Sequence, residues 1–161
     1  RHIDIDIYGG CGQLRCPKSQ DAECEDQLTT TYKFYLSFEN SICDDYVSEK
    51  FFRLFVRRLH VVPVVRGGAD YARFFPRGAF VNAADFSNAA DLALHLQKLS
   101  QDVDAYAKML KEKDKLLALG HTLDWCDLCK KVHTDKDTKT IPDIKAWSHY
   151  EGVCRKPNDV V

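Results

Sequence analysis

The sequence predicts an α/β domain built on a mostly parallel, Rossmann-like sheet. Strand-like and helix-like patterns alternate from residue 3 to residue 119, which is the order expected of successive β-α-β units. One run, residues 61–65, is apolar at every position, as in a strand buried on both faces of a parallel sheet. A chain of 161 residues is long enough for one domain with its own core. We place this domain at residues 1–119 and a cysteine-rich tail at residues 120–161.

Two strands and a long loop account for the first quarter of the chain. Residues 3–8 alternate apolar and polar side chains and predict a strand with one apolar face. Three glycines directly after them end this strand, and a polar loop is expected to continue to about Thr31. Residues 32–38 are rich in aromatic side chains and predict the second strand.

Helices and strands then alternate. Apolar residues recur at spacings of three and four after Asp45, which predicts a helix that Asp44 or Asp45 could cap. Ser87 could cap a later helix. The predicted elements are, in order, a helix over 45–58, the buried strand over 61–65, a strand over 79–83, and helices over 88–99 and 102–119.

Composition argues against several kinds of partner. Lys and Arg number 23 against 24 Asp and Glu, a net charge of −1, so bulk charge does not favour nucleic acid or a membrane surface. No run of 18 apolar residues occurs, so we expect none of these residues to span a bilayer. The chain opens with Arg1 and has no signal-peptide pattern, which indicates a fragment or processed piece of a longer protein.

Seven cysteines lie toward the two ends of the chain, which predicts disulfides and a secretory-pathway protein. Because seven is odd, at least one thiol is free or bonds outside this chain. The alternative is zinc, since Cys126 and Cys129 form a C-x2-C followed by His133, and Cys154 or His121 could complete the site. Disulfides are favoured because the cysteines at the other end of the chain also need an explanation.

The candidate ligand site lies where the strand over 32–38 runs toward the helix over 45–58. Ligands of open parallel sheets bind at the carboxyl ends of the strands. Tyr46, Glu49 and Lys50 would share one face of the helix start. Unpaired N–H groups there and the Lys50 ammonium would favour phosphate, while Glu49 could accept hydrogen bonds from sugar hydroxyls. A diphosphate between two sugars would use all three side chains.

Each chemical signal also has a purely structural explanation. Glu49 could pair with the arginine one turn later, and Glu–Lys runs on helices are often only solvated. No glycine-rich phosphate loop of known spacing occurs. Asp4 and Asp6 resemble a metal-binding carboxylate pair, but as alternate residues of a strand they are predicted to face solvent. His60 and His95 lie within or beside apolar segments and are predicted to pack or to lie on the surface, without a metal.

Several blocks of sequence resemble the alpha-1,3-fucosyltransferases. The runs YKFYLSFENS at 32–41 and DYVSEKF at 45–51 are similar to the signature of that family. Two blocks follow in the family's order, VPVV at 62–65 and FVN with a later DF at 80–86. The tail resembles invertebrate and core-type members at Trp125, Cys126, Cys129, His133, Asp143, Ile144, Trp147 and Cys154.

The resemblance implies a GT-B glycosyltransferase with two Rossmann-like domains, of which this chain would be the C-terminal, donor-binding half. Such enzymes transfer L-fucose from GDP-fucose to a GlcNAc hydroxyl of a glycan, in alpha-1,3 linkage and with inversion. The family's donor contacts fall on Tyr35, Asn40, Tyr46, Glu49 and Lys50. Lys50 would neutralise the departing pyrophosphate. Tyr46 and Glu49 would hold the ribose or the fucose, and Asn40 the sugar or phosphate oxygens.

The resemblance places the general base in an acceptor domain outside this chain, so we expect no catalytic residue here and no activity from this part alone. It implies no obligatory metal, although a divalent cation could be stimulatory. The acceptor would be a GlcNAc-containing glycan or glycoprotein, and the location the Golgi lumen, within a single-pass type II membrane protein anchored upstream of this chain. The alternatives are an inactive nucleotide-sugar-binding module and a disulfide-stabilised interaction domain.

The resemblance also bears on the cysteines. It suggests that Cys126 and Cys129 bond to cysteines outside this chain, in a stem or acceptor domain. Cys154, and the close pair Cys11 and Cys16, could then form local bridges within this chain. The spacing of Cys11 and Cys16 permits a bridge if the intervening glycine allows a turn.

Overall fold

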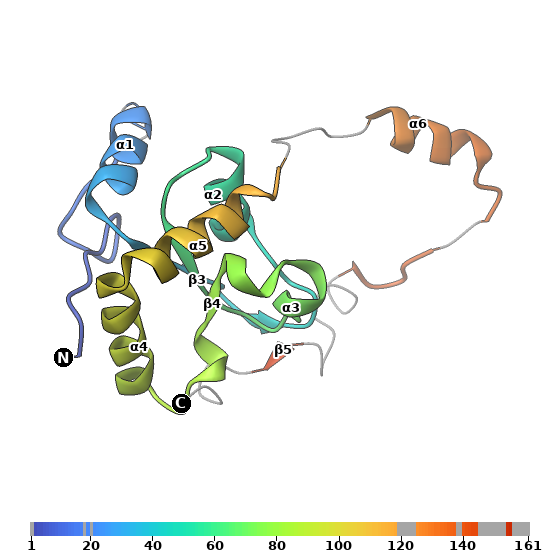
Figure 1. The fold of residues 1–161 in the computed structure, drawn as a ribbon. Coiled ribbons are helices and arrows are strands. Elements are labelled where there is room, and N and C mark those ends of the chain that lie inside the picture. Colours follow the sequence, from blue (N-terminus) through green and yellow to red (C-terminus); the bar gives the residue numbers. More distant parts are fainter. Residues whose placement is uncertain are drawn as a thin grey trace.

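The computed structural model describes residues 2–17, 19, 21–118, 125–137, 140–144 and 154–155. A three-stranded parallel sheet lies at its centre, in the order β1 (Phe34–Phe38), β3 (Val62–Arg66) and β4 (Val81–Asn82). The main helices are α2 (Glu49–Val56), α3 (Tyr71–Phe74), α4 (Ala89–Gln101) and α5 (Val103–Asp114) (Figure 1). The expected α/β class with a parallel sheet is confirmed.

The middle strand divides the core into two clusters. Val61 and Val65 pack with α2 and α3 on one side of the sheet, and Val62 and Val64 pack with α4 and α5 on the other. All four valines are 0% exposed. The continuously apolar run therefore forms the strand buried on both faces that its pattern predicts, with β1 and β4 as its parallel neighbours.

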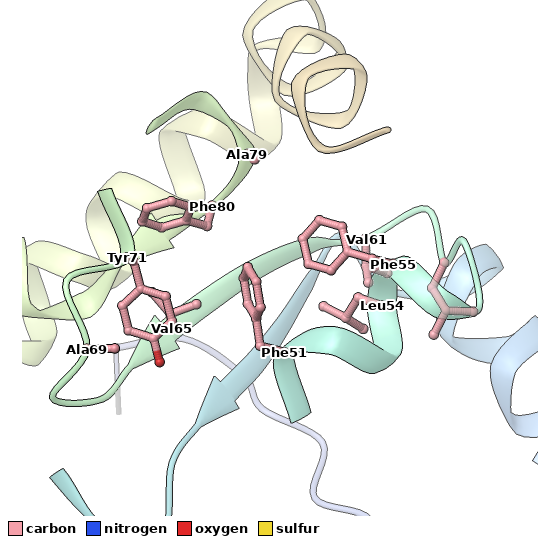
Figure 2. Packing of buried hydrophobic residues seen from close by; sticks show 10 residues of the cluster. Phe51, Leu54, Phe55, Val61, Val65, Ala69, Tyr71, Ala79 and Phe80 are labelled. Carbon is pink, nitrogen blue, oxygen red and sulfur yellow. The ribbon is translucent and has the colours of Figure 1, made fainter. Parts of the chain in front are cut away.

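Four aromatic side chains, Phe51, Phe55, Tyr71 and Phe80, are among the ten buried residues of the cluster under α2. Phe51 is 0% exposed, and its ring centroid lies 4.7 Å from those of both Phe55 and Phe75 and 5.8 Å from that of Tyr71. Figure 2 shows the Phe51 ring between α2 and β3, with the Tyr71 ring next to it. Apolar positions three and four apart thus place one face of α2 on the sheet, as predicted.

The helix caps differ from those predicted. The side chain of Ser48 caps α2 by accepting from the backbone N–H of Lys50, and Asp45 lies before it at a positive φ of 55°. The cap of α4 is Asn88, whose side-chain oxygen accepts from Asp91 N at 2.9 Å, so Ser87 is not the cap. α2 begins later than expected because a short strand, β2 (Ile42–Cys43), is followed by a turn in which Tyr46 N donates to the Cys43 carbonyl and Asp45 has a left-handed backbone.

The strand predicted over residues 3–8 does not form, and the loop predicted to reach Thr31 contains a helix. In the N-terminal part, the structure shows only a single bridge between Tyr8 and Leu14. The helix α1 (Asp21–Thr31) buries none of its residues, so it lacks an amphipathic signal. Glu25 on α1 instead pairs with Arg53 and Arg57 of α2, at 3.4 and 3.3 Å.

Two disulfides correct the predicted pairing. Cys16 bonds to Cys24 at the start of α1, so the predicted Cys11–Cys16 bridge is wrong. Cys154 forms a bridge within this chain as predicted, but the bond is not local, because its partner Cys43 lies 111 residues away. Cys154 lies on β5 (Cys154–Arg155), which pairs antiparallel with β2. The reason is the same in both cases: folding brings each sulfur to a partner that is not its nearest in sequence.

The tail also contains a helix, α6 (Trp125–Thr134), where no pattern was predicted. Cys126 and Cys129 lie on this helix, and their thiols are exposed and free. The thiol of Cys11, in the N-terminal segment, is also exposed and free. Bonds from Cys126 and Cys129 to cysteines outside this chain stay a prediction, as does the domain boundary at residue 119. The described residues also include the 3-10 helices η2 (Arg77–Ala79) and η3 (Ala83–Asp85). No helix in the described part of the chain is long and apolar enough to cross a membrane.

Candidate functional site

The carboxyl ends of β1 and β3 lie side by side, with Phe38 opposite Arg66. The next residue, Glu39, continues the pairing because its N–H donates to the Arg66 carbonyl at 2.9 Å. Residues 39–48, here the β1–α2 loop, leave the sheet at this edge and end at the start of α2. Parallel sheets bind ligands at this edge, and the loop together with the first turn of α2 carries four of the five predicted donor contacts.

Lys50 is the partly exposed cation of the site. Its ammonium lies 3.5 Å from Ser48 Oγ and 3.4 Å from Glu49 Oε1, and its side chain is 28% exposed. Its backbone is held from below, because the buried hydroxyl of Ser37 donates to the Lys50 carbonyl at 3.1 Å. The start of α2 is thereby tied to β1 near its carboxyl end, with the Lys50 ammonium partly exposed.

Glu49 lies beside Lys50 and is exposed. Its partial burial raises the pKa, but a hydrogen bond from its own backbone N–H and the neighbouring Lys50 ammonium lower it more, so the net pKa is below the usual value. Glu49 is therefore ionised at neutral pH. The arginine expected to pair with it, Arg53, points instead to Glu25 and Asp21 of α1.

Two backbone N–H groups at the start of α2 already donate within the chain, which corrects the expectation that all of them would be unpaired and open to phosphate. Ser48 N donates to Glu39 Oε1 at 2.8 Å, and Lys50 N donates to Ser48 Oγ at 3.4 Å. Because these two donors are satisfied inside the chain, positive charge for an anion at this site comes mainly from the Lys50 ammonium.

The other predicted contacts lie at different depths. Asn40 and Tyr46 are exposed on the β1–α2 loop, with Tyr46 39% exposed. Tyr35 is half-buried in the middle of β1 and packs against the cluster under α2. The structure therefore gathers Asn40, Tyr46, Glu49 and Lys50 on one loop and one helix turn, while Tyr35 lies below them in the sheet.

The remaining candidates have other positions. Asp4, Asp6, His60 and His95 are exposed. Of the two possible fourth ligands for zinc, Cys154 is in a disulfide and His121 lies outside the described residues. Within the described ranges, no three His, Cys, Asp or Glu side chains are close enough together to hold a metal ion. The zinc alternative at the C-x2-C therefore loses Cys154 as a ligand.

One hollow lies away from this edge. It measures about 600 Å³ and is lined by residues 3–8, residues 31–36, Leu28 and Leu96. It runs along the side of β1 and not at its carboxyl end, so it does not include the β1–α2 loop. We base the candidate site on the loop, because the ionised and cation-bearing side chains are there.

Three buried residues beneath the loop were not singled out from the sequence: Ser37, Glu39 and Tyr71. Ser37 and Glu39 are polar positions of β1 and its end that are 0% and 9% exposed, and Tyr71 is 1% exposed. A serine at an inward-facing position of a strand was the available signal for the first. For Glu39 and Tyr71 no local pattern existed, because their environment is made by segments distant in sequence.

Residues 1–147 match the model of a protein family described as glycosyltransferase family 10 (fucosyltransferase), C-terminal part. The chain belongs to this family. Among its relatives in Drosophila melanogaster, alpha-(1,3)-fucosyltransferase C is 40% identical over 148 residues, which is 90% of this chain and 34% of that protein. Glycoprotein 3-alpha-L-fucosyltransferase A is 35% identical over 159 residues, 96% of this chain and 31% of that protein.

A human relative and a solved structure agree with this assignment. The human 3-galactosyl-N-acetylglucosaminide 4-alpha-L-fucosyltransferase FUT3 is 35% identical over 150 residues, covering 91% of this chain and 40% of that protein. A crystal structure of alpha1,3-fucosyltransferase with GDP-fucose superimposes with a TM-score of 0.55 at 28% identity, covering 73% of this chain and 36% of that one. The chain thus spans about a third of the length of the relatives it matches.

Proposed function

We propose that this chain is the donor-binding part of an alpha-1,3-fucosyltransferase that transfers L-fucose from GDP-fucose to a GlcNAc hydroxyl of a glycan. The observation that carries the proposal is the placement of Lys50, a partly exposed cation held by Ser37 and Ser48 at the carboxyl edge of a parallel sheet. The family assignment supports it, as does the likeness to an enzyme solved with GDP-fucose.

Each exposed side chain has a role in this proposal. The Lys50 ammonium neutralises the pyrophosphate, whose charge grows as the bond to fucose breaks and GDP leaves. Asn40 can donate its amide N–H groups to phosphate or sugar oxygens. The ionised Glu49 accepts hydrogen bonds from sugar hydroxyls, and Tyr46 offers a ring face with a hydroxyl at its end. Tyr35 supports the loop from the sheet.

These residues bind and orient the donor but do not activate the acceptor. Inversion needs a base on the acceptor side of the fucose, and we propose that this base lies in the part of the enzyme outside this chain. The proposal includes a GlcNAc-bearing glycan or glycoprotein as acceptor and a Golgi-luminal, type II membrane enzyme as the complete protein. A divalent cation is proposed as a stimulant only.

The decisive experiment compares GDP binding to the parent chain and to Lys50→Ala by calorimetry. A charge-assisted contact to phosphate is worth about 1.5–3 kcal/mol, so the variant should bind GDP at least about tenfold more weakly. Lys98→Ala is the matched control, because Lys98 is an exposed lysine on α4. Its GDP affinity should equal that of the parent.

Two outcomes would contradict the proposal. Equal GDP affinity in Lys50→Ala and the parent would show that Lys50 does not contact the pyrophosphate. If neither GDP nor GDP-fucose raises the melting temperature of the parent chain, the interaction-domain alternative is favoured, since a ligand at 100 times its dissociation constant should add about 2.7 kcal/mol to the stability.

A further inference from the structure

Glu39 is a buried carboxylate that closes the β1–α2 loop. It lies directly after β1 and is 9% exposed. Its backbone N–H donates to the Arg66 carbonyl at 2.9 Å, and its side-chain Oε1 accepts from Ser48 N at 2.8 Å. The two bonds join the end of β3, the first residue of the loop and the last residue of the loop. A single side chain thus fixes the distance between the two ends of the loop.

The bond from Ser48 N to Glu39 Oε1, here called the clamp, also sets the position of Lys50. Ser48, whose backbone Glu39 holds, caps α2 through the bond from Lys50 N to its Oγ and lies 3.5 Å from the Lys50 ammonium. A carboxylate is well suited to this place because negative charge at the start of a helix is stabilised by the helix dipole. Moving Ser48 would therefore move both the backbone and the side chain of Lys50.

The far side of Glu39 is enclosed by the segment that follows β3. In the described part of the chain, Glu39 Oε2 and the hydroxyl of Tyr71 are buried without a hydrogen-bond partner. A Cβ at Gly67 would lie 2.6 Å from the Tyr71 hydroxyl and 3.2 Å from Glu39 Cγ, so only glycine fits between them. Figure 2 shows Tyr71 as part of the ring cluster, which leaves its ring little freedom to withdraw.

A buried carboxylate with one unpaired oxygen costs stability, which a carboxylate at the surface of the loop would not. Its retained contact is the bond to Ser48. We propose that Glu39 is a positioning residue for the donor, which acts through Ser48 to hold Lys50 and the loop that carries Asn40 and Tyr46. This inference rests on the proposed function, since the ligand it serves is the nucleotide sugar.

The test uses three variants of the 161-residue chain. Glu39→Ala removes the acceptor for Ser48 N. Glu39→Gln keeps an acceptor oxygen of the same reach without the charge. Leu99→Ala is the control for lost stability, because Leu99 is buried on the opposite face of the sheet and touches neither the loop nor α2.

Two measurements are made on each variant: amide hydrogen exchange of the loop, which needs no nucleotide, and the dissociation constant for GDP. In Glu39→Ala we expect the Ser48 amide to exchange at least about tenfold faster and GDP to bind about tenfold more weakly, as for a lost bond to a charged group. In Glu39→Gln, the exchange rate of the Ser48 amide and the dissociation constant for GDP should both lie within about fivefold of the parent values. Leu99→Ala should leave GDP affinity within about twofold.

The inference is overturned if Glu39→Ala binds GDP as tightly as the parent, or if Glu39→Gln is as impaired as Glu39→Ala. Should Glu39→Ala fail to fold, Glu39→Asp must show the same two defects, because it withdraws the carboxylate by one methylene while keeping the charge. A parent chain that binds neither GDP nor GDP-fucose defeats the proposed function and with it the donor role of Glu39. Unchanged exchange of the Ser48 amide in Glu39→Ala defeats the clamp alone.

Discussion

The β1–α2 loop and the N-terminal segment, residues 2–17, look alike in sequence but differ in how they are held. Both are polar, both contain two aspartates and both enter a disulfide. Beneath the loop, Ser37 and Glu39 are buried and bonded to the start of α2. In the N-terminal segment Ile5 and Ile7 are 50% and 52% exposed. Polar residues become a defined site where buried groups hold their backbone.

The difference comes from the sheet. The β1–α2 loop leaves a strand that pairs with β3 over all five of its residues, so the end of that strand is held in place. The N-terminal segment has the alternation of a strand but makes only one bridge. Its side-chain contacts include a chain of hydrogen bonds at its surface, in which the Tyr8 and Tyr32 hydroxyls lie 2.9 Å apart and Tyr32 donates to Asp6 at 2.6 Å.

The largest expected difference between the two regions is in their disulfides. The Cys43–Cys154 bond closes 111 residues and the Cys16–Cys24 bond only 8. From the loss of chain entropy on cross-linking, removing the first should cost about 4.7 kcal/mol and removing the second about 2.5 kcal/mol. Urea unfolding of the two double Cys→Ser variants, each also carrying Cys11→Ser, Cys126→Ser and Cys129→Ser to prevent exchange, measures both. The comparison fails if the short bridge proves the more costly to lose.

An intermediate effect is expected at high pH. Burial, and then the negative charge of Glu39, raise the pKa of Tyr71 from 10.0 to about 12. The neutral phenol therefore stabilises the folded chain fully below pH 10, and this contribution, about 2.7 kcal/mol, is lost as the pH rises through 12. Tyr71→Phe should remove this loss, so that its unfolding free energy falls less than that of the parent between pH 10 and 12.

Tyr32 is the matched control for the other region. The pKa of Tyr32 is also raised, by its hydrogen bonds to Asp6 and then Tyr8. Because solvent screens these contacts, Tyr32→Phe should change the pH dependence less than Tyr71→Phe does. A larger change in Tyr32→Phe would show that the N-terminal segment is held more firmly than its exposure indicates.

The smallest effect is expected for Asp6→Ala in the N-terminal segment. Its carboxylate is exposed and accepts one bond from Tyr32, so the unfolding free energy should change by less than about 0.5 kcal/mol. The corresponding change at the loop, Ser48→Ala, removes the cap of α2 and should cost about 1 kcal/mol. If urea unfolding shows that Asp6→Ala costs more stability than Ser48→Ala, the contrast between the two regions is contradicted.

Sequence patterns predicted the elements that carry their own burial signal. The strands β1 and β3 and the helices α2, α4 and α5 each bury an apolar face or run, and that periodicity can be read without knowing the partner. The helix α1 could not be found in this way because it buries no residue and is held by ion pairs from α2 and by a disulfide. The strand predicted over residues 3–8 failed for the converse reason, since a strand pattern needs a neighbour to pair with.

The candidate site also has features that local sequence patterns predict and features that they do not. The position of Lys50 at the start of a helix after a strand was predictable because both elements have local patterns. The use of the N–H groups of Ser48 and Lys50 by Glu39 and Ser48 was not predictable, since the bond from Ser48 to Glu39 spans nine residues and closes only when the loop folds back.

By itself, the sequence determined the α/β class, the buried central strand, the family and the segment that carries Lys50, because these depend on the order and spacing of side chains along the chain. Only the tertiary structure decided which cysteines bond and which polar groups are buried together. Cys43 meets Cys154 because β2 pairs with β5, and Glu39 lies beside Gly67 and Tyr71 because β1 and β3 are neighbours in the sheet and their carboxyl ends bring distant segments to one edge. Such contacts between distant segments have no period along the chain.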